Sequence, residues 1–181
     1  MSVFTALPMT ASAAASGTCG DNLTWTLDDN GTLTVSGTGE MQGYSYSNRA
    51  PWDAKSGSIK TIVIQNGVTS IGERAFYNCG NLKSITIPDS VTSIGDMAFY
   101  DCSSLTSITI PDSITSIGYM AFFGCTSLKS ITIPDSVTSI EGNVFCGCSS
   151  LENIIVDSNN TYYCSLNGNL YNKNKTEFLS Y

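Results

Sequence analysis

The most regular feature of the chain is an alternation of apolar and polar residues that recurs at a constant interval. In its clearest form the segment reads SITIPDSVTSIG, beginning at Ser84, and near-copies begin at Ser107 and Ser130. Each copy completes the pattern Leu-x-x-Ile-x-Ile, whose last three positions alternate as in a short β-strand with one buried face. The proline that follows favours a turn, because it has no N–H to donate to a sheet.

Alignment at the 23-residue offset produces columns of similar apolar residues. The columns before the proline are Ile59, Leu82, Leu105, Leu128 and Leu151; Ile62, Ile85, Ile108, Ile131 and Ile154; and Ile64, Ile87, Ile110, Ile133 and Val156. The columns after it are Val68, Val91, Ile114 and Val137; Ile71, Ile94, Ile117 and Ile140; and Phe76, Phe99, Phe122 and Phe145. Repetition at this period is the signature of a solenoid, in which each coil buries its apolar face against its neighbours. We therefore expect a short parallel sheet with strands about 4.8 Å apart.

The segment before the repeats predicts an N-terminal cap. Residues 23–36 alternate on both sides of Asp28-Asp29-Asn30-Gly31, a strong hairpin signal. This hairpin is expected to cover the exposed edge of the first coil. Residues 37–57 are predicted to form a connecting loop. Three of its aromatic residues are expected either to pack on the first phenylalanine of the column or to form a platform for a sugar: Tyr44, Tyr46 and Trp52.

The repeat weakens after Val156. Asn167-Gly168 predicts a hairpin turn, and a second turn at residues 172–175 leads into a segment that resembles the beginning of a strand. Residues 157–181 are therefore expected to form either a C-terminal cap or the start of a further irregular repeat. Before them, residues 17–58 are expected to form the N-terminal hairpin cap and its loop, and residues 59–156 to form the repeats.

The first 16 residues are apolar and then rich in alanine and serine. They are typical of the end of a secretory signal peptide, with Ala-x-Ala-like cleavage sites and a mature chain that begins near Gly17. Since a basic segment is missing, a disordered leader is the alternative. No stretch reaches the roughly 18 apolar residues of a membrane span, so membrane insertion is not expected.

The composition is acidic. Asp and Glu number 15 against 8 Lys and Arg, which gives a net charge of -7. An acidic surface repels phosphate groups, so nucleic acid and anionic membranes are not expected partners. The low charge content fits a secreted or cell-surface protein.

The residue types argue against catalysis and against a cofactor. The chain has no histidine, which excludes Ser-His-Asp and Cys-His catalysis and histidine zinc sites. Asp89, Asp112 and Asp135 form a column, whereas glycoside hydrolysis needs two carboxylates that face each other. The column either coordinates a cation such as calcium or, as we favour, forms the turn after each proline. We expect no enzyme activity and no bound metal.

Seven cysteines divide into two groups. Cys79, Cys102, Cys125 and Cys148 form a column, where they act as small, buried, free thiols or bridge adjacent coils. The remaining three, Cys19, Cys146 and Cys164, lie outside the column. Two of these could pair in a secreted chain, and Cys146 with Cys164 is the favoured pair, but the sequence leaves the pairing open.

Two sets of residues are candidate binding positions. The outward strand face carries hydroxyl groups, at Ser84, Thr86, Ser107, Thr109, Ser130 and Thr132. Beside the phenylalanine column lies an aromatic strip, at Tyr77, Tyr100 and Phe123. Nearby positions that vary between copies are Arg74, Met97, Met120 and Tyr119. The strip serves either packing or contact with a partner.

The repeated pattern Leu-x-x-Ile-x-Ile-Pro-x-Ser-Val-x-x-Ile-Gly-x-x-Ala-Phe-x-x-Cys, over Ile59 to about Val156, resembles the BspA-like class of leucine-rich repeats. The stretch CGDNLTWTLDDNGTLTVSG resembles the amino-terminal caps of such proteins. The resemblance implies an α/β leucine-rich-repeat solenoid that is rich in β-structure, with its sheet on a concave face. It also implies a bacterial module that is secreted or at the cell surface.

Two functions remain open from the sequence. The first is adhesion, through binding of a protein or glycan on a host or neighbouring cell or in its matrix. The second is a structural spacer in a larger surface protein, with no ligand of its own. Exposed terminal strands also predict weak pairing of two copies through a terminal edge.

Overall fold

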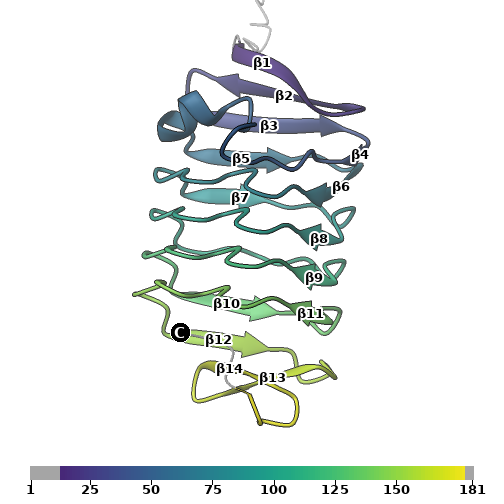
Figure 1. Cartoon of the computed structure of the whole chain (residues 1–181), viewed down its shortest axis with the longest axis vertical. Helices are drawn as coiled ribbons and strands as arrows, with labels where there is room; N and C mark the ends of the chain where they lie inside the picture. The colour runs from purple at the N-terminus through teal and green to yellow at the C-terminus, as the bar shows by residue number, and fades with distance from the viewer. Residues whose placement is uncertain (1–12, 178–181) are drawn as a thin grey trace, which may run out of the picture.

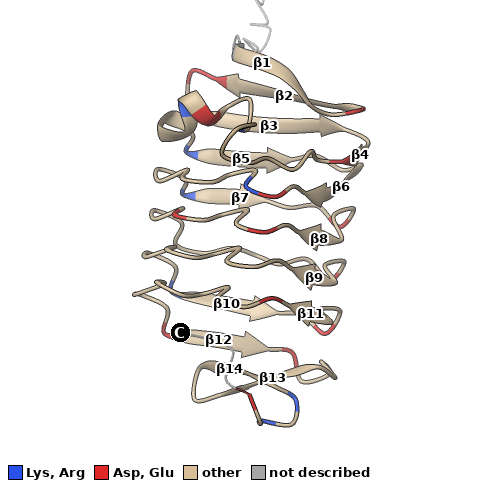
Figure 2. Ribbon diagram, viewed as in Figure 1, with Lys and Arg blue, Asp and Glu red and all other residues tan. Residues whose placement is uncertain are grey.

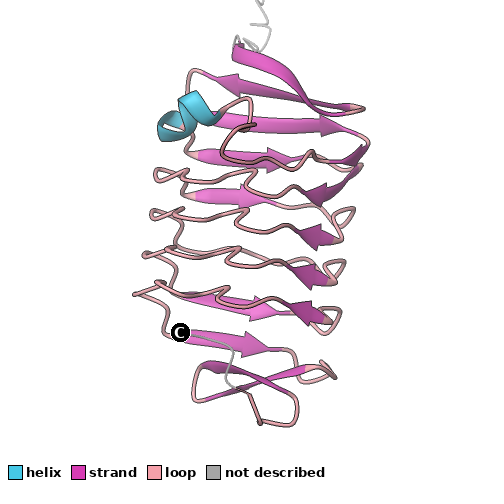
Figure 3. Ribbon diagram, in the orientation of Figure 1, coloured by secondary structure: helices cyan, strands magenta, loops and turns pink. Residues whose placement is uncertain are grey.

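The computed structural model describes residues 13–177, whose coils stack along one axis (Figure 1). Strands and turns make up nearly all of it, and a 3₁₀ helix, Asp53–Ser58, is the one helix in this range (Figure 3). The strands of the N-terminal half are β1 Ala13–Gly20, β2 Leu23–Asp28, β3 Thr32–Gly37, β4 Gly39–Glu40, β5 Thr61–Ile64, β6 Val68–Ile71 and β7 Ser84–Thr86. Those of the C-terminal half are β8 Ser93–Ile94, β9 Ser116–Ile117, β10 Ser130–Ile133, β11 Ser139–Ile140, β12 Asn153–Val156, β13 Tyr163–Leu166 and β14 Asn169–Asn172.

The predicted parallel sheet runs along one side of the coils. Strand β5 pairs with β7 so that Thr61 lies opposite Ser84, and β10 pairs with β12 so that Ser130 lies opposite Asn153. Both offsets equal the period of the sequence repeat. In the coil between them only a single bridge forms, from Ser107 to Ser130, although Ile108 and Ile110 are buried as expected.

A second parallel sheet, in the order β11-β9-β8-β6-β4, was not predicted. Strands β6, β8, β9 and β11 carry the isoleucine column that follows the proline, from Ile71 to Ile140. Threonines strengthen this side, because Thr115 donates both its N–H and its hydroxyl to the carbonyl oxygen of Thr92, at 2.8 and 3.2 Å. This sheet could not be predicted from the sequence pattern, because its strands have only two to four residues and their alternation is too short to recognise.

The third side of each coil is a turn segment rather than a strand. In four of the coils its first residue has a left-handed backbone: φ is 51° at Arg74, 52° at Met97, 52° at Met120 and 59° at Asn143. Non-glycine residues rarely adopt this conformation. Backbone hydrogen bonds to the next coil hold it in place, for example from Arg74 N–H to the carbonyl oxygen of Asp96 at 2.8 Å.

The core is a continuous column of aromatic rings inside the stacked coils. Successive ring centroids lie 5.3 to 5.9 Å apart along Trp52, Phe76, Phe99, Phe122 and Phe145. All five side chains are fully buried. The indole N–H of Trp52 donates to the carbonyl oxygen of Ala75 at 2.7 Å, so its polar atom is satisfied in the core.

The N-terminal cap has three strands instead of the predicted hairpin. Strands β1, β2 and β3 are antiparallel, and β3 then pairs in parallel with β5. Strand β1 begins at Ala13, so the boundary predicted at Gly17 falls within it; that boundary stays a prediction. Residues 1–12 lie outside the described residues. The α/β class also needs correction, since the described residues contain no α-helix.

The last two strands of the described residues form a β13–β14 hairpin, and its turn is the predicted Asn167-Gly168, with φ of 52° and 79°. A buried asparagine joins this hairpin to the preceding coils. The Asn160 amide donates to the carbonyl oxygens of Pro134 and Val137, at 2.8 and 3.0 Å. Its side-chain oxygen accepts from two backbone N–H groups of the chain that follows. Asn160 continues the Val137 column and caps carbonyl groups where the apolar column ends. The end of the predicted C-terminal strand, residues 178–181, lies outside the described residues.

We expect Asn160→Ala to lower the free energy of unfolding by about 2–4 kcal/mol, because it removes four hydrogen bonds made by a fully buried side chain. Urea denaturation followed by circular dichroism measures the change. The exposed neighbour gives a matched control, Asn159→Ala, with an expected change below about 0.5 kcal/mol. Equal effects of the two substitutions would contradict the capping role.

An aromatic ladder as the candidate functional site

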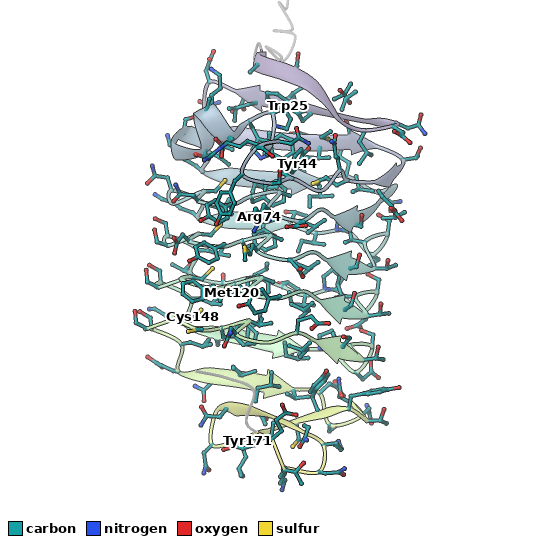
Figure 4. All side chains as sticks on the ribbon, viewed as in Figure 1. Trp25, Tyr44, Arg74, Met120, Cys148 and Tyr171 are labelled. Atoms are coloured by element: carbon teal, nitrogen blue, oxygen red, sulfur yellow. The ribbon has the colours of Figure 1, made fainter. Side chains whose placement is uncertain are left out.

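The turn segment sends one aromatic side chain inward and the next outward. Between the left-handed residues Arg74 and Asn78 lie Ala75, Phe76 and Tyr77. Ala75 and Phe76 are buried, whereas Tyr77 is half-exposed. Arg74 is the first residue of one such turn segment, and Met120 is the first residue of the turn segment two coils later (Figure 4). The second left-handed residue of the turn has φ of 58° at Asn78 and 54° at Asp101.

The outward rings form a second stack, which we call the aromatic ladder: Tyr46, Tyr77, Tyr100 and Phe123. Tyr77 and Tyr100 are stacked with centroids 4.9 Å apart, and Tyr100 and Phe123 with centroids 4.7 Å apart. Tyr46 packs edge-on against Tyr77 at 6.3 Å and is 67% exposed. The predicted strip Tyr77, Tyr100 and Phe123 is therefore continuous, and the loop adds Tyr46 to it.

The three aromatic residues of the connecting loop do not share one role. Trp52 stacks on Phe76, as expected. Tyr44 is buried and packs edge-on against Trp52 at 6.0 Å. Tyr46 does not pack on Phe76, because it is exposed and extends the ladder; a role in sugar binding stays a prediction. Sequence spacing could not separate these residues, because the loop has no repeat to align.

Charged groups at the N-terminal end of the ladder are paired. The Arg74 guanidinium lies 4.8 Å from the centre of the Tyr46 ring and pairs with Glu73. Arg49 pairs with Asp53 at 3.2 Å. A cavity of about 20 Å³ lies among these side chains. That space holds about one water molecule, so a ligand would contact this end from outside.

The aromatic ladder has its own electrostatic environment. Burial, followed by contact with Tyr46 and then by the charges of nearby groups, raises the pKa of Tyr77. Burial, followed by the negative charge of Asp101, raises the pKa of Tyr100. Both hydroxyls are therefore protonated at neutral pH, and the one of Tyr77 lies against the Tyr46 side chain.

The hydroxyl face is a separate surface. All six of its predicted residues are exposed, on β7, on β10 and in the coil segment between them: Ser84, Thr86, Ser107, Thr109, Ser130 and Thr132. Within residues 13–177 no hydrogen bond or ring contact joins this face to the aromatic ladder. It offers short polar side chains and lacks the aromatic and arginine anchors that dominate tight interfaces.

The aspartate column lies on turns. The backbone N–H of Ile114 donates to the carbonyl oxygen of Pro111 at 3.1 Å, which closes the turn around Asp112. Ser113 joins the turn to the preceding coil, through a 2.6 Å bond to the carbonyl oxygen of Val91. Asp89, Asp112 and Asp135 are exposed, and no hydrogen bond to their carboxylates is found in the described part. The turn is confirmed, but serine and backbone groups make the bonds that were predicted for aspartate.

The described residues contain neither a metal-binding cluster nor a membrane-spanning helix. No group of three or more His, Cys, Asp or Glu residues is arranged to hold a metal ion. No helix there is long and apolar enough to cross a membrane. A hollow of about 560 Å³ lies at the N-terminal cap and is lined by glycines and polar residues with Met41. The aromatic ladder is therefore the strongest candidate surface.

The family follows from the repeat itself. Residues 54–175 match the BspA type leucine-rich repeat region in six copies. The chain belongs to the BspA-type leucine-rich-repeat family. This match confirms the family that the Leu-x-x-Ile-x-Ile pattern predicted. A search of curated proteins finds no matching sequence.

Solved structures of bacterial leucine-rich-repeat proteins are similar to this BspA-type chain. A protein from Eubacterium ventriosum is 35% identical with a TM-score of 0.71, over 92% of this chain and 51% of its own. One from Bacteroides ovatus is 34% identical with a TM-score of 0.56, over 74% of this chain and 39% of its own. The chain thus spans about half the length of the Eubacterium protein and less of the other. The pneumococcal vaccine antigen PcpA shares the fold, at 19% identity and a TM-score of 0.55, over 93% of this chain and 56% of its own.

The cysteines of this BspA-type chain are all free. Cys79, Cys102, Cys125 and Cys148 are buried as predicted. Each of the last three donates its thiol hydrogen to a phenylalanine carbonyl oxygen, as Cys102 does to Phe76 at 3.2 Å. Cys19 is also buried. The favoured disulfide between Cys146 and Cys164 is not formed; both thiols are half-exposed.

We expect the native protein to expose two reactive thiols, at Cys146 and Cys164, because the other five are buried. Titration with Ellman's reagent should show two fast equivalents, and denaturant should release the rest. Cys146→Ser and Cys164→Ser should each remove one fast equivalent. A fast count of zero in the unreduced protein, or of five or more, would contradict the structure.

Burial should also make the protein less stable at alkaline pH. Loss of water raises the pKa of the Cys19 thiol to about 11, and burial with a smaller effect of Asp53 raises the pKa of the Cys79 thiol to about 12. An unfolded thiol ionises near pH 8.5. Below about pH 8.5 the two thiols contribute fully to the free energy of unfolding. Between that pH and about pH 11–12 the contribution falls, because these thiols ionise in the unfolded chain and stay protonated in the folded one. Urea midpoints measured from pH 8 to 11 should decline, and Cys79→Ala should decline less steeply. Identical slopes would contradict this assignment.

Proposed function

We propose that this chain is a non-enzymatic binding module of a secreted or cell-surface protein and that it contacts a protein or glycan partner through the aromatic ladder. One observation carries the proposal: the repeat maintains two parallel aromatic stacks, and only one of them is in the core. The inner stack, from Trp52 to Phe145, fills the coils. The outer stack leaves Tyr77, Tyr100 and Phe123 half-exposed at the surface.

The outer stack has the properties of a contact surface. Aromatic residues are enriched at the energetic centres of protein interfaces, because they bury large areas at small entropic cost. Ring stacking also holds the three side chains in one orientation before a partner binds. Such preorganisation reduces the entropy lost on association. The hydroxyl face is rigid as well, but it offers no comparable anchor.

The surface location is part of the same proposal. The apolar, alanine-rich beginning of the sequence and the acidic composition support it. PcpA, which shares the fold, is described as a vaccine antigen. Pairing of two copies through a terminal edge stays a prediction; β1 is the outer strand of its sheet.

Binding to an array of extracellular-matrix proteins and glycans tests the function. The test variant combines Tyr77→Ser, Tyr100→Ser and Phe123→Ser, with Tyr100→Ser alone as the milder form. We expect saturable binding by the wild type and a loss of at least tenfold in the variants, since single aromatic anchors contribute about 2 kcal/mol or more. A matched variant of the hydroxyl face, Thr86→Ala with Thr109→Ala and Thr132→Ala, should bind normally. Circular dichroism checks folding.

Three results would contradict the proposal in different ways. Full binding by the folded ladder variants would exclude the ladder as the contact surface. Loss of binding only in the threonine variant would assign it to the hydroxyl face. The absence of any saturable binding by the wild type would favour the spacer function.

A further inference from the structure

The stacked rings of the aromatic ladder expose their edges instead of their faces. The planes of Tyr77 and Tyr100 are within 11° of each other, and those of Tyr100 and Phe123 within 7°. Each ring therefore covers the face of its neighbour. On the N-terminal side of this stack, Tyr46 packs edge-on against Tyr77.

This orientation bears on the class of partner. Planar ligands and cations bind to the face of an aromatic ring, and a sugar ring stacks in the same way. Ring edges carry the positive end of the quadrupole, so they suit carbonyl oxygens and aliphatic side chains. A polypeptide offers both of these groups at short intervals. The geometry therefore favours a polypeptide over a glycan.

An unpaired carboxylate lies beside the aromatic ladder. Asp101 follows Tyr100 directly, and its left-handed backbone, with φ of 54°, directs the side chain over Gly124 of the next coil. A Cβ at Gly124 would overlap the Asp101 Oδ1, and the φ of 70° at this position also favours glycine. Asp101 is half-buried, and no hydrogen bond or ion pair to its carboxylate occurs within residues 13–177. Burial raises the pKa of Asp101.

This carboxylate is specific to one coil. The same position holds Asn78 in the preceding coil and Gly124 and Gly147 in the following ones. The Asp101 Oδ1 lies over Gly124, the residue that follows Phe123 of the ladder. The negative charge of Asp101 also contributes, after burial, to the raised pKa of Tyr100.

The cations near the aromatic ladder already have partners. Arg74 pairs with Glu73, and Arg49 pairs with Asp53. Figure 2 shows few basic residues along the turn segments, in keeping with a net charge of -7. A partly desolvated charge without a counter-ion is unfavourable, and an ion pair with a bound ligand would relieve that cost.

We infer that the partner of the aromatic ladder is a polypeptide segment with a lysine or arginine side chain that pairs with Asp101. Its ammonium or guanidinium group binds the carboxylate, and its aliphatic stem covers the edges of the neighbouring rings, as long basic side chains do on apolar surfaces. The phenol hydroxyls of Tyr77 and Tyr100 donate to its backbone carbonyl groups. This inference rests on the function proposed above and specifies the chemistry of the partner.

Asp101→Asn tests the ion pair without disturbing the turn. Asparagine fits a left-handed backbone, as Asn78 shows at the equivalent position with φ of 58°. Asp112→Asn is the matched control, because it removes the same charge from an exposed turn that has no part in the ladder. The probe is a phage-displayed library of random dodecapeptides, selected on the wild-type protein. The enriched peptides are then synthesised, and their affinities are measured by fluorescence anisotropy.

We expect enrichment of lysine or arginine over the input library. Asp101→Asn should weaken the enriched peptides about tenfold, as the loss of a charged hydrogen bond does, and Asp112→Asn less than twofold. Replacement of the basic residue of the peptide by citrulline or norleucine should weaken its binding to the wild-type protein about tenfold as well. The same replacement should not further weaken its binding to the Asp101→Asn variant.

The possible failures are distinguishable. Enriched peptides without basic residues, or equal losses in the two asparagine variants, would overturn this inference. If such peptides still lose binding in the ladder variants, the proposed function stands. A ladder-dependent glycan on the array, with no enriched peptide, would overturn the polypeptide assignment alone. Failure of every ligand to bind would overturn both proposals.

Discussion

Hydrogen bonding between the backbones of adjacent coils is the interaction on which the whole structure depends. Two sides of each coil use parallel strands that are offset by one repeat. On the third side, backbone groups of the turn segments form the hydrogen bonds, for example from Phe76 N–H to the Ala98 carbonyl oxygen at 2.8 Å. A coil without neighbours would leave these groups and its apolar columns exposed to water. At the N-terminal end these groups are covered by β1–β3, and beyond the last regular coil Asn160 and the β13–β14 hairpin satisfy them.

The same dependence explains why two aromatic stacks exist side by side. Because every coil repeats one turn, a residue that points inward in one coil does so in all of them, and the residue after it points outward in all of them. Phe76 and Tyr77 thus begin two stacks that run along the same axis. The inner stack stabilises the coils. The outer one shares the regular spacing but remains at the surface, where a single coil adds Asp101. Repetition supplies a rigid surface, and departures from it supply specificity.

Much of this architecture could be predicted because it is periodic. The apolar columns, the parallel sheet, the Asn167-Gly168 turn and the strip of Tyr77, Tyr100 and Phe123 each depend on spacing or local turn chemistry. The errors occur where these signals end. The second sheet has strands of two to four residues, the N-terminal cap has one strand more than its hairpin signal indicates, and Tyr46 lies in a loop without a repeat. Asn160 was missed because an asparagine in a weakened repeat resembles an ordinary loop residue.

The sequence by itself determined the period, the family and the side chains that share a column, because a constant offset between copies places equivalent residues one above another in any stacked arrangement. Only the tertiary structure decided how the columns face one another. It showed that the outward rings cover one another's faces, that Asp101 extends over Gly124 without a partner, and that the half-exposed Cys146 and Cys164 are not bonded. These properties depend on left-handed turns and on contacts between coils, and a linear pattern of residue types contains neither.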